Sequence, residues 1–221
     1  MGAVRAWSVV VPAKRLPLAK TRLTPLTDGL GGPPGAAHAR LVLALLADTV
    51  AAALACPAVA GVLVVTDDTA AGEVVTRLGA RTVPDEPDRG LNPALAHGAR
   101  ATGSTAVAAL SSDLPALRPE ELTAALAAAE ARVGGRGGRC FVADAQGTGT
   151  TLLTAVATDL SPAFGAGSAQ RHAAGGAVEL PGTWPGLARD VDTAEDLRAA
   201  LALGVGTHTA AVLGGARPRT G

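Results

Sequence analysis

Short apolar runs alternate with segments of helical periodicity over the first 139 residues of the chain. Runs rich in β-branched residues predict buried strands, and apolar residues spaced three and four apart predict helices. The expected strands are 9–11, 60–65, 80–83 and 105–110, and the expected helices are 36–56, 69–78, 92–101 and 119–132. Strands and helices that alternate in this way predict an α/β fold with a parallel sheet and right-handed crossovers.

The pattern changes after residue 139, where strand-like segments follow one another directly. The expected elements are strands at 140–143, 151–156, 177–180 and 187–191, a Gly/Ser-rich loop at 164–172 and a helix at 193–203. In this last helix Thr193 is the expected cap, and Asp196 stands three residues later, close to a capping box. We therefore expect one domain over residues 1–205 and an irregular tail over 206–221.

The composition argues against several classes of protein. Lys and Arg number 19, as do Asp and Glu, whereas nucleic-acid-binding proteins usually carry a basic excess. The apolar run 41–60 contains Asp48 and Pro57 and is too polar for a membrane span. Cys56 and Cys140 fit no metal spacing and indicate buried free thiols. We expect a cytoplasmic protein that binds neither nucleic acid nor membrane.

A basic loop follows the first strand and contains Lys14, Arg15, Lys20 and Arg22. Ligands of parallel sheets bind beyond the carboxyl ends of the strands, so cations at this place indicate a site for phosphate groups. The alternative is a solvated basic loop, which is what most clusters of charge are. Neither GxxxxGK[ST] nor GxGxxG is present, so the usual phosphate-loop and dinucleotide signatures are absent.

Carboxylates stand at the ends of two expected strands. Asp113 follows the strand at 105–110, and Asp190 and Asp192 end the last one. Either could simply cap a turn. Together with Lys14 and Lys20 they favour a Mg²⁺ site, because this ion takes few protein ligands and completes its octahedron with phosphate oxygens and water.

A third cluster is rich in glycine and hydroxyl groups. It comprises Gly147–Thr150 and Gly165–Ser168, with Arg171 and His172 close behind. Backbone N–H groups at glycines and hydroxyl donors can form a nest for an anion. The alternative is a pair of ordinary hairpin loops.

Seven segments together resemble a known enzyme family. They are VPAKRLPLAKTRL, GLNPAL, SSDLPAL, FVADAQGTGTTLL, FGAGSAQRH, GAVELPGTWPG and RDVDTAEDL, and they span about residues 7 to 205. They are similar to the guanylyltransferases of coenzyme F-420 biosynthesis, described with 2-phospho-L-lactate as acceptor in archaea and with phosphoenolpyruvate in actinobacteria. The resemblance implies the Rossmann-like, three-layer fold of the molybdenum-cofactor guanylyltransferase superfamily, a mostly parallel central sheet with a small β excursion around residues 139–180.

The resemblance also implies roles for individual residues. The acceptor-phosphate contacts of the family fall on Thr150, Gly165 and Ser168, and its metal carboxylates fall on Asp113 and Asp190. The broader superfamily carries glycines in the first loop, where this chain has VPAKR, and Ser111-Ser112 stands where a glycine-containing version is expected.

The implied reaction joins GMP from GTP to the phosphate of phosphoenolpyruvate and releases pyrophosphate. Its expected catalytic groups are Lys14, Lys20, Asp113 and Asp190. Its expected nucleotide-binding groups are Lys14, Lys20 and Arg22, with Asn92 and the loop before it as candidates for contacting guanine. A phosphomonoester is mostly dianionic at neutral pH, so no general base is required. The sequence also offers no obvious base: His38, His97 and His208 lie on expected helices or in the tail, where a structural role is expected.

Several alternatives stay open. The acceptor could be 2-phospholactate; the Ala-, Gly- and Arg-rich composition fits an actinobacterium and favours phosphoenolpyruvate. Asp190-Val191-Asp192 could be the DxD motif of a nucleotide-sugar glycosyltransferase, and a GTP-binding sensor without turnover is a third reading. A homodimer and a hand-off of product to the next enzyme of the pathway are also left open.

Overall fold

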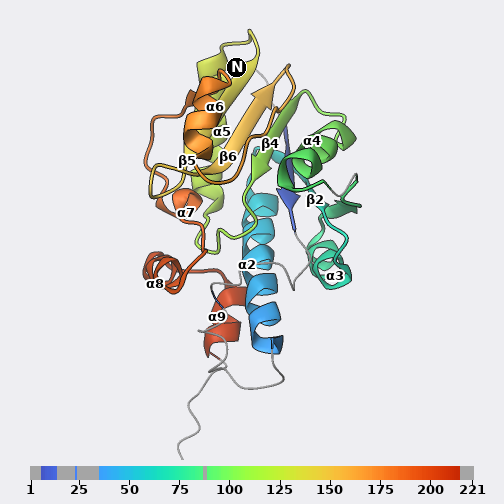
Figure 1. The fold of residues 1–221 in the computed structure, drawn as a ribbon, viewed down its shortest axis with the longest axis vertical. Coiled ribbons are helices and arrows are strands. Elements are labelled where there is room, and N and C mark those ends of the chain that lie inside the picture. The colour runs from blue at the N-terminus through green and yellow to red at the C-terminus, as the bar shows by residue number, and fades with distance from the viewer. Residues whose placement is uncertain (1–5, 14–22, 24–34, 87–88, 215–221) are drawn as a thin grey trace, which may run out of the picture.

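The computed structural model describes residues 6–13, 23, 35–86 and 89–214. Seven strands form one sheet in the order β3-β2-β1-β4-β6-β5-β7 (Figure 1). The strands are β1 (Trp7–Pro12), β2 (Val59–Val65), β3 (Arg81–Val83), β4 (Ala106–Leu110), β5 (Gly138–Ala143), β6 (Thr150–Val156) and β7 (Val178–Glu179). Only β6 runs against its neighbours, β4 and β5, and the other pairs are parallel. The predicted mostly parallel sheet with a β excursion after residue 139 is confirmed.

Helices cover both faces of the sheet and make three layers. The larger are α2 (Ala36–Ala55), α3 (Thr69–Leu78), α4 (Leu91–Ala101), α5 (Pro119–Val133) and α8 (Ala194–Leu203), and the shorter are α6 (Ser168–Ala174), α7 (Pro185–Ala188) and α9 (Thr207–Gly214). Successive residues of β1 serve opposite faces: Val9 packs in the core with α2, α3 and α5, and Val10 packs in the core with α4 and α6. The continuous apolar run of β1 is thus explained by burial on both sides.

Close packing of α4 on the sheet depends on one glycine. A Cβ at Gly98 would lie 2.6 Å from methyl carbons of both Val10 and Val65. Any larger residue would push α4 away from the sheet.

α2 is the one described helix that is by itself long and apolar enough to cross a membrane, with a mean hydropathy of 1.6 over its best window. Of that window, 56% is buried inside the protein, where α2 lies between the sheet, α5 and α9. α8 and α9 pass the same test only as a pair bent by 117°. The core position of α2 accounts for its apolar character.

Four local predictions were wrong. Residues 187–191 form no strand: Pro185 starts the short helix α7, and the Glu121 carboxylate on α5 accepts the N–H groups of Gly186 and Leu187 at 3.2 and 3.0 Å. The loop at 164–172 turns into α6 at Ser168. Asn92 followed by Pro93 predicts a helix capped by Asn92, whereas α4 begins at Leu91 with Gly90 at the cap position.

The fourth concerns the tail, which we expected to be irregular from residue 206. Thr207–Gly214 is helix α9, and Figure 1 shows it (red) beside α2 (blue). The carboxylate of Asp48 on α2 accepts the N–H groups of His208 and Thr209 at 3.0 and 2.8 Å. A buried acid from a distant helix therefore satisfies the first donors of α9. Residues 215–221 lie outside the described residues.

Candidate functional site

A cavity of about 490 Å³ opens at the edge of the sheet where the parallel strands end. β4 ends at Leu110 on this edge, and antiparallel β6 begins there with Thr150. This reversal of one strand brings Asp113, after β4, and Thr150, at the start of β6, into the same cavity. The predicted site residues that line it are Asp113, Asp190, Thr150, Gly165 and Ser168. The predicted metal carboxylates and the predicted acceptor contacts thus share one cavity.

Three hydrogen bonds, to β6, to α2 and to the loop between α7 and α8, hold the segment that carries Asp113. The N–H of Ser111 donates to the Thr151 carbonyl on β6 (2.8 Å), and the N–H of Leu114 donates to Oγ1 of Thr49 on α2 (2.9 Å). The N–H of Val191 donates to the Asp113 carbonyl (3.1 Å). Asp113 is 6% exposed, so its carboxylate is buried at the cavity wall. The third bond also fixes the neighbouring residues, Asp190 and Asp192, beside it.

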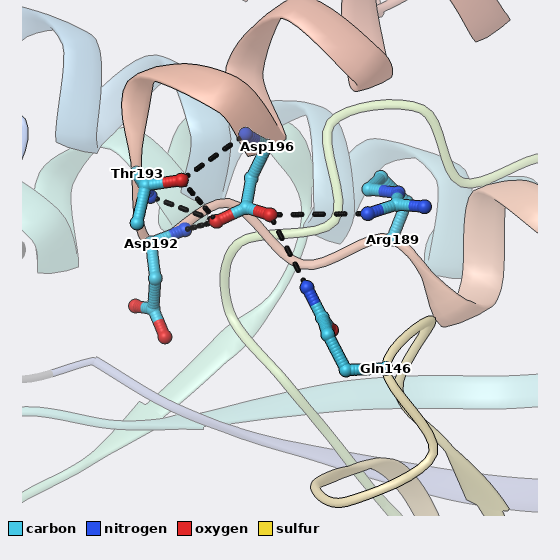
Figure 2. Close-up of polar contacts among 5 residues, drawn as sticks. All are labelled: Gln146, Arg189, Asp192, Thr193 and Asp196. Atoms are coloured by element: carbon cyan, nitrogen blue, oxygen red, sulfur yellow. Dashed lines mark hydrogen bonds and ion pairs between the residues drawn. The ribbon is translucent and has the colours of Figure 1, made fainter.

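Asp196 organises the segment that carries Asp190 and Asp192 (Figure 2). Its Oδ2 accepts the N–H of Asp192 (3.3 Å) and both the N–H and hydroxyl of Thr193 (2.9 and 2.7 Å). Its Oδ1 accepts from Nε2 of Gln146 (3.3 Å) and lies 3.8 Å from Arg189. The predicted capping box is complete, because Oγ1 of Thr193 accepts the N–H of Asp196 (3.2 Å). In Figure 2 the carboxylate of Asp192 points away from this cluster.

The first of the two glycine-rich loops predicted to form an anion nest already binds a carboxylate of the protein itself. The carboxylate of Asp144 accepts the N–H groups of Thr148 and Gly149 at 2.9 and 2.8 Å. A Cβ at Gly149 would lie 2.3 Å from Oδ2 of Asp144, so only glycine allows this contact. The amides of this loop are therefore not available to a phosphate, and our interpretation of them as a nest was wrong. The second glycine-rich loop, Gly165–Ser168, lines the cavity as expected.

Three side chains fix the second loop, residues 163–167. Asn92 accepts the N–H of Phe164 (2.7 Å) and donates to its carbonyl (3.1 Å). Arg171 donates to the carbonyls of Ala163 and Ala166, and Nε2 of His172 accepts the N–H of Ala163 (2.9 Å). These contacts fix the main-chain conformation of the loop through side chains that do not line the cavity.

Asn92 was a candidate nucleotide contact, and the structure gives it a different place. Both ends of its amide bond Phe164, and it is not among the residues that line the cavity. Its neighbour Leu91 does line the cavity. Lys14, Lys20 and Arg22, the other expected nucleotide-binding groups, lie outside the described residues.

The charge of the described cavity wall is negative. Asp113, Asp144, Asp190 and Asp192 contribute carboxylates to it. Among the lining residues in the described part of the chain, no side chain is cationic. An anionic ligand at this edge therefore needs positive charge from a metal ion or from the basic loop after β1.

Two buried groups that do not line the cavity have shifted pKa values. Burial, followed by the charges of Arg171 and Arg139, lowers the pKa of His172 from 6.5 to about 4. Burial raises the pKa of the Cys140 thiol despite Arg132 and a hydrogen bond from Thr154. Cys56 and Cys140 are both free and buried, as expected.

Sequence reasoning missed Asp144, His172 as a loop anchor, and Asp196 as the centre of a cluster. One local signal existed for Asp144, because an Asp a few residues before a Gly-rich turn commonly accepts its amides. The partners of Asn92 and His172 are remote in sequence, so no local pattern marks them.

Comparison with known proteins shows the family of the chain. Residues 37–178 match the family described as MobA-like NTP transferase domain. A protein of Geodermatophilus obscurus named phosphoenolpyruvate guanylyltransferase is 81% identical over 221 residues, covering 100% of both chains. A Streptomyces coelicolor protein of the same name is 55% identical, covering 93% of this chain and 95% of its own.

Solved structures agree on the fold. A nucleotidyl transferase from Methanothermobacter superposes with a TM-score of 0.63 at 22% identity, covering 90% of this chain and 97% of its own. A 4-diphosphocytidyl-2C-methyl-D-erythritol synthase from Anaerococcus prevotii superposes with a TM-score of 0.55 at 12% identity, covering 90% and 96%. The Rossmann-like nucleotidyltransferase architecture is thus shared with both.

Proposed function

The chain belongs to the MobA-like NTP transferase family, and we propose that it transfers GMP from GTP to phosphoenolpyruvate and releases pyrophosphate. One observation carries this proposal beyond the names of the relatives. Carboxylates from two segments and a hydroxyl- and glycine-rich wall meet in one cavity at the carboxyl edge of the sheet. Such a cavity can hold a nucleoside triphosphate and a second phosphate ester side by side.

The donor set fits Mg²⁺, with Asp113 and Asp190 as its protein ligands. Both line the cavity, and the Val191–Asp113 backbone bond holds their segments together. No group of three or more metal-binding side chains occurs among the described residues, which suits an ion that is usually bound by one or two carboxylates plus phosphates and water. When bound, the ion would neutralise charge on the phosphates as the transition state forms.

The acceptor phosphate is assigned to the wall formed by Thr150, Gly165 and Ser168. An oxygen of this phosphate attacks the α-phosphorus of GTP in line, a new P–O bond forms, and the bond from the α-phosphorus to the β-phosphate oxygen breaks. The attacking oxygen carries no proton, because the second pKa of a phosphomonoester is about 6. Catalysis then consists of positioning and electrostatic stabilisation, with Lys14, Lys20 and Arg22 assigned to the triphosphate.

The choice of acceptor depends on a small difference in shape. Phosphoenolpyruvate and 2-phospholactate differ in whether the carbon that bears the phosphate is planar or tetrahedral. Contacts to the phosphate alone cannot distinguish them, and a small difference in shape changes binding by only ~1–3 kcal/mol. The name shared by the relatives from Geodermatophilus and Streptomyces favours phosphoenolpyruvate.

The wider setting follows from this assignment. The product is a guanylylated diphosphate, which suits the coenzyme F-420 pathway of the family that the sequence resembles. A cytoplasmic location, a homodimer and a hand-off of this product to the next enzyme belong to the same proposal.

Pyrophosphate release tests the proposal. With GTP and Mg²⁺ present, release should require phosphoenolpyruvate. Ser168→Ala should raise the half-saturating concentration of phosphoenolpyruvate by about tenfold, because one hydrogen bond to its charged phosphate is lost. Thr76→Ala, an exposed change on α3, should have no effect. Pyrophosphate release that does not depend on an acceptor would contradict the proposed function. So would a half-saturating phosphoenolpyruvate concentration that is the same for Ser168→Ala as for the control.

A further inference from the structure

His172 lies on α6 directly behind the cavity wall. It is 3% exposed, and its ring is 5.1 Å from that of Phe164 and 6.0 Å from that of Phe141 between centroids. It is not itself a lining residue, whereas its hydrogen-bond partner Thr150 is. The imidazole is thus placed to act through Thr150 and not on a ligand directly.

The hydrogen bonds of the ring fix where its proton lies. The backbone N–H of Ala163 donates to Nε2 of His172 at 2.9 Å. A backbone N–H can only donate, so Nε2 must present a lone pair, and the proton of the neutral ring is assigned to Nδ1. Burial between Arg171 and Arg139, which lowers the pKa to about 4, keeps the ring neutral at pH 7.

The position of that proton determines the role of Thr150. Nδ1 of His172 lies 2.9 Å from Oγ1 of Thr150, so the ring N–H donates and the hydroxyl accepts. A hydroxyl that accepts from the ring still has its own proton to donate. Among the described residues, Oγ1 has no second hydrogen-bond partner, and Thr150 lines the cavity.

We infer that His172 is a positioning residue that holds the Thr150 hydroxyl as a hydrogen-bond donor toward the acceptor phosphate. The inference rests on the proposed function, which puts that phosphate at Thr150. A phosphate dianion offers only lone pairs, whereas a monoanion carries a proton of its own. A hydroxyl fixed as a donor therefore bonds most strongly to the more highly charged dianion, the form whose oxygen can attack without a general base.

A purely structural role, in which His172 only anchors Ala163 of the 163–167 loop, makes a different prediction. The two roles use different ring nitrogens, and two amide side chains separate them. In His172→Asn the amide reaches the place of Nδ1, so it keeps a donor for Thr150 and loses the acceptor for Ala163. In His172→Gln the amide reaches the place of Nε2, so it keeps the loop anchor and loses the donor.

The first experiment measures half-saturating concentrations from pyrophosphate release at neutral pH. We expect His172→Gln to raise the value for phosphoenolpyruvate about tenfold, with the value for GTP unchanged, because a hydrogen bond to a charged phosphate weakens. His172→Asn should stay within about threefold of the unaltered chain by the same reasoning. The reverse order, or equal losses in both variants, would overturn the inference.

A double-mutant cycle tests whether His172 acts through Thr150. Thr150→Val alone should raise the half-saturating phosphoenolpyruvate concentration, and His172→Gln should then add no further increase. Independent, additive effects would overturn the inference. Thr151→Val serves as the matched control: Thr151 is buried next to Thr150, and its Oγ1 makes no hydrogen bond within the described residues.

A readout independent of turnover separates this inference from the proposed function. Nitrogen NMR of the imidazoles, with His172 identified by the signals missing from His172→Gln, should show the proton on Nδ1. A proton on Nε2 would overturn the inference whether or not the chain is active. A chain with the proton on Nδ1 that releases no pyrophosphate would instead overturn the proposed function, and with it the phosphate that Thr150 is inferred to contact.

Discussion

The backbone N–H of Val191 donates a 3.1 Å hydrogen bond to the carbonyl oxygen of Asp113. This bond joins the segment after β4 to the segment after α7, which are remote in sequence. It holds Asp113 and Asp190 at the same cavity although they belong to different elements. A two-carboxylate metal site therefore depends on main-chain geometry as well as on the two side chains.

The metal assignment predicts that Asp113→Asn and Asp190→Asn each leave the fold intact and reduce turnover about a hundredfold or more, because each removes charge from an electrostatic site. Circular dichroism checks the fold, and pyrophosphate release checks turnover. Asp159→Asn, an exposed change, is the control. Near-normal turnover in both variants would contradict the two-carboxylate site.

Asp196 should matter for stability before it matters for chemistry. Asp196→Ala removes the acceptor of three hydrogen bonds at the start of α8, and we expect the free energy of unfolding to fall by about 2 kcal/mol. Denaturant unfolding measures this, with Glu195→Ala, an exposed neighbour in the same turn, as the control. Equal stability of the two variants would show that the cluster in Figure 2 does not hold this segment.

A change in the basic loop should affect the two substrates differently. Lys20→Ala should weaken GTP binding or slow turnover, while the half-saturating concentration of phosphoenolpyruvate hardly changes, because the lysine is assigned to the triphosphate. Calorimetry with GTP measures the binding. Unchanged GTP affinity together with unchanged turnover would mean that the loop is a solvated surface.

The low pKa of His172 predicts how stability depends on pH. The unfolded chain binds a proton at this residue below 6.5, whereas the folded chain does so only below about 4. The free energy of unfolding therefore falls as the pH drops from 6.5 to about 4, by on the order of 3 kcal/mol in total, and this contribution is constant above 6.5. Denaturant unfolding of the unaltered chain and of His172→Gln should show a difference in stability that shrinks over this range. A difference independent of pH would contradict the shift.

The elements that the sequence predicts well are those with strong local periodicity. β1, β2, β4 and α5 follow from apolar runs and helical spacing, and the ends of the parallel strands correctly put Asp113 at the edge that carries the cavity. The strand predicted at 187–191 failed because a remote side chain, Glu121, stabilises a helical turn there.

The site was harder to predict wherever a contact joins distant segments. The amides of Thr148 and Gly149 look available in the sequence and are occupied by Asp144 in the fold. Asn92 looks like a helix cap and instead fixes Phe164. Such pairings depend on tertiary packing, which local propensity does not encode.

Phosphorus NMR of a reaction containing GTP, Mg²⁺ and phosphoenolpyruvate tests the central claim most directly. The account predicts that the phosphoenolpyruvate resonance gives way to two coupled resonances of an unsymmetrical diphosphate, with an equal amount of pyrophosphate. The same experiment with 2-phospholactate shows which acceptor is preferred. Consumption of GTP to GMP or GDP with the phosphoenolpyruvate resonance unchanged, or no consumption of GTP, would contradict guanylyl transfer.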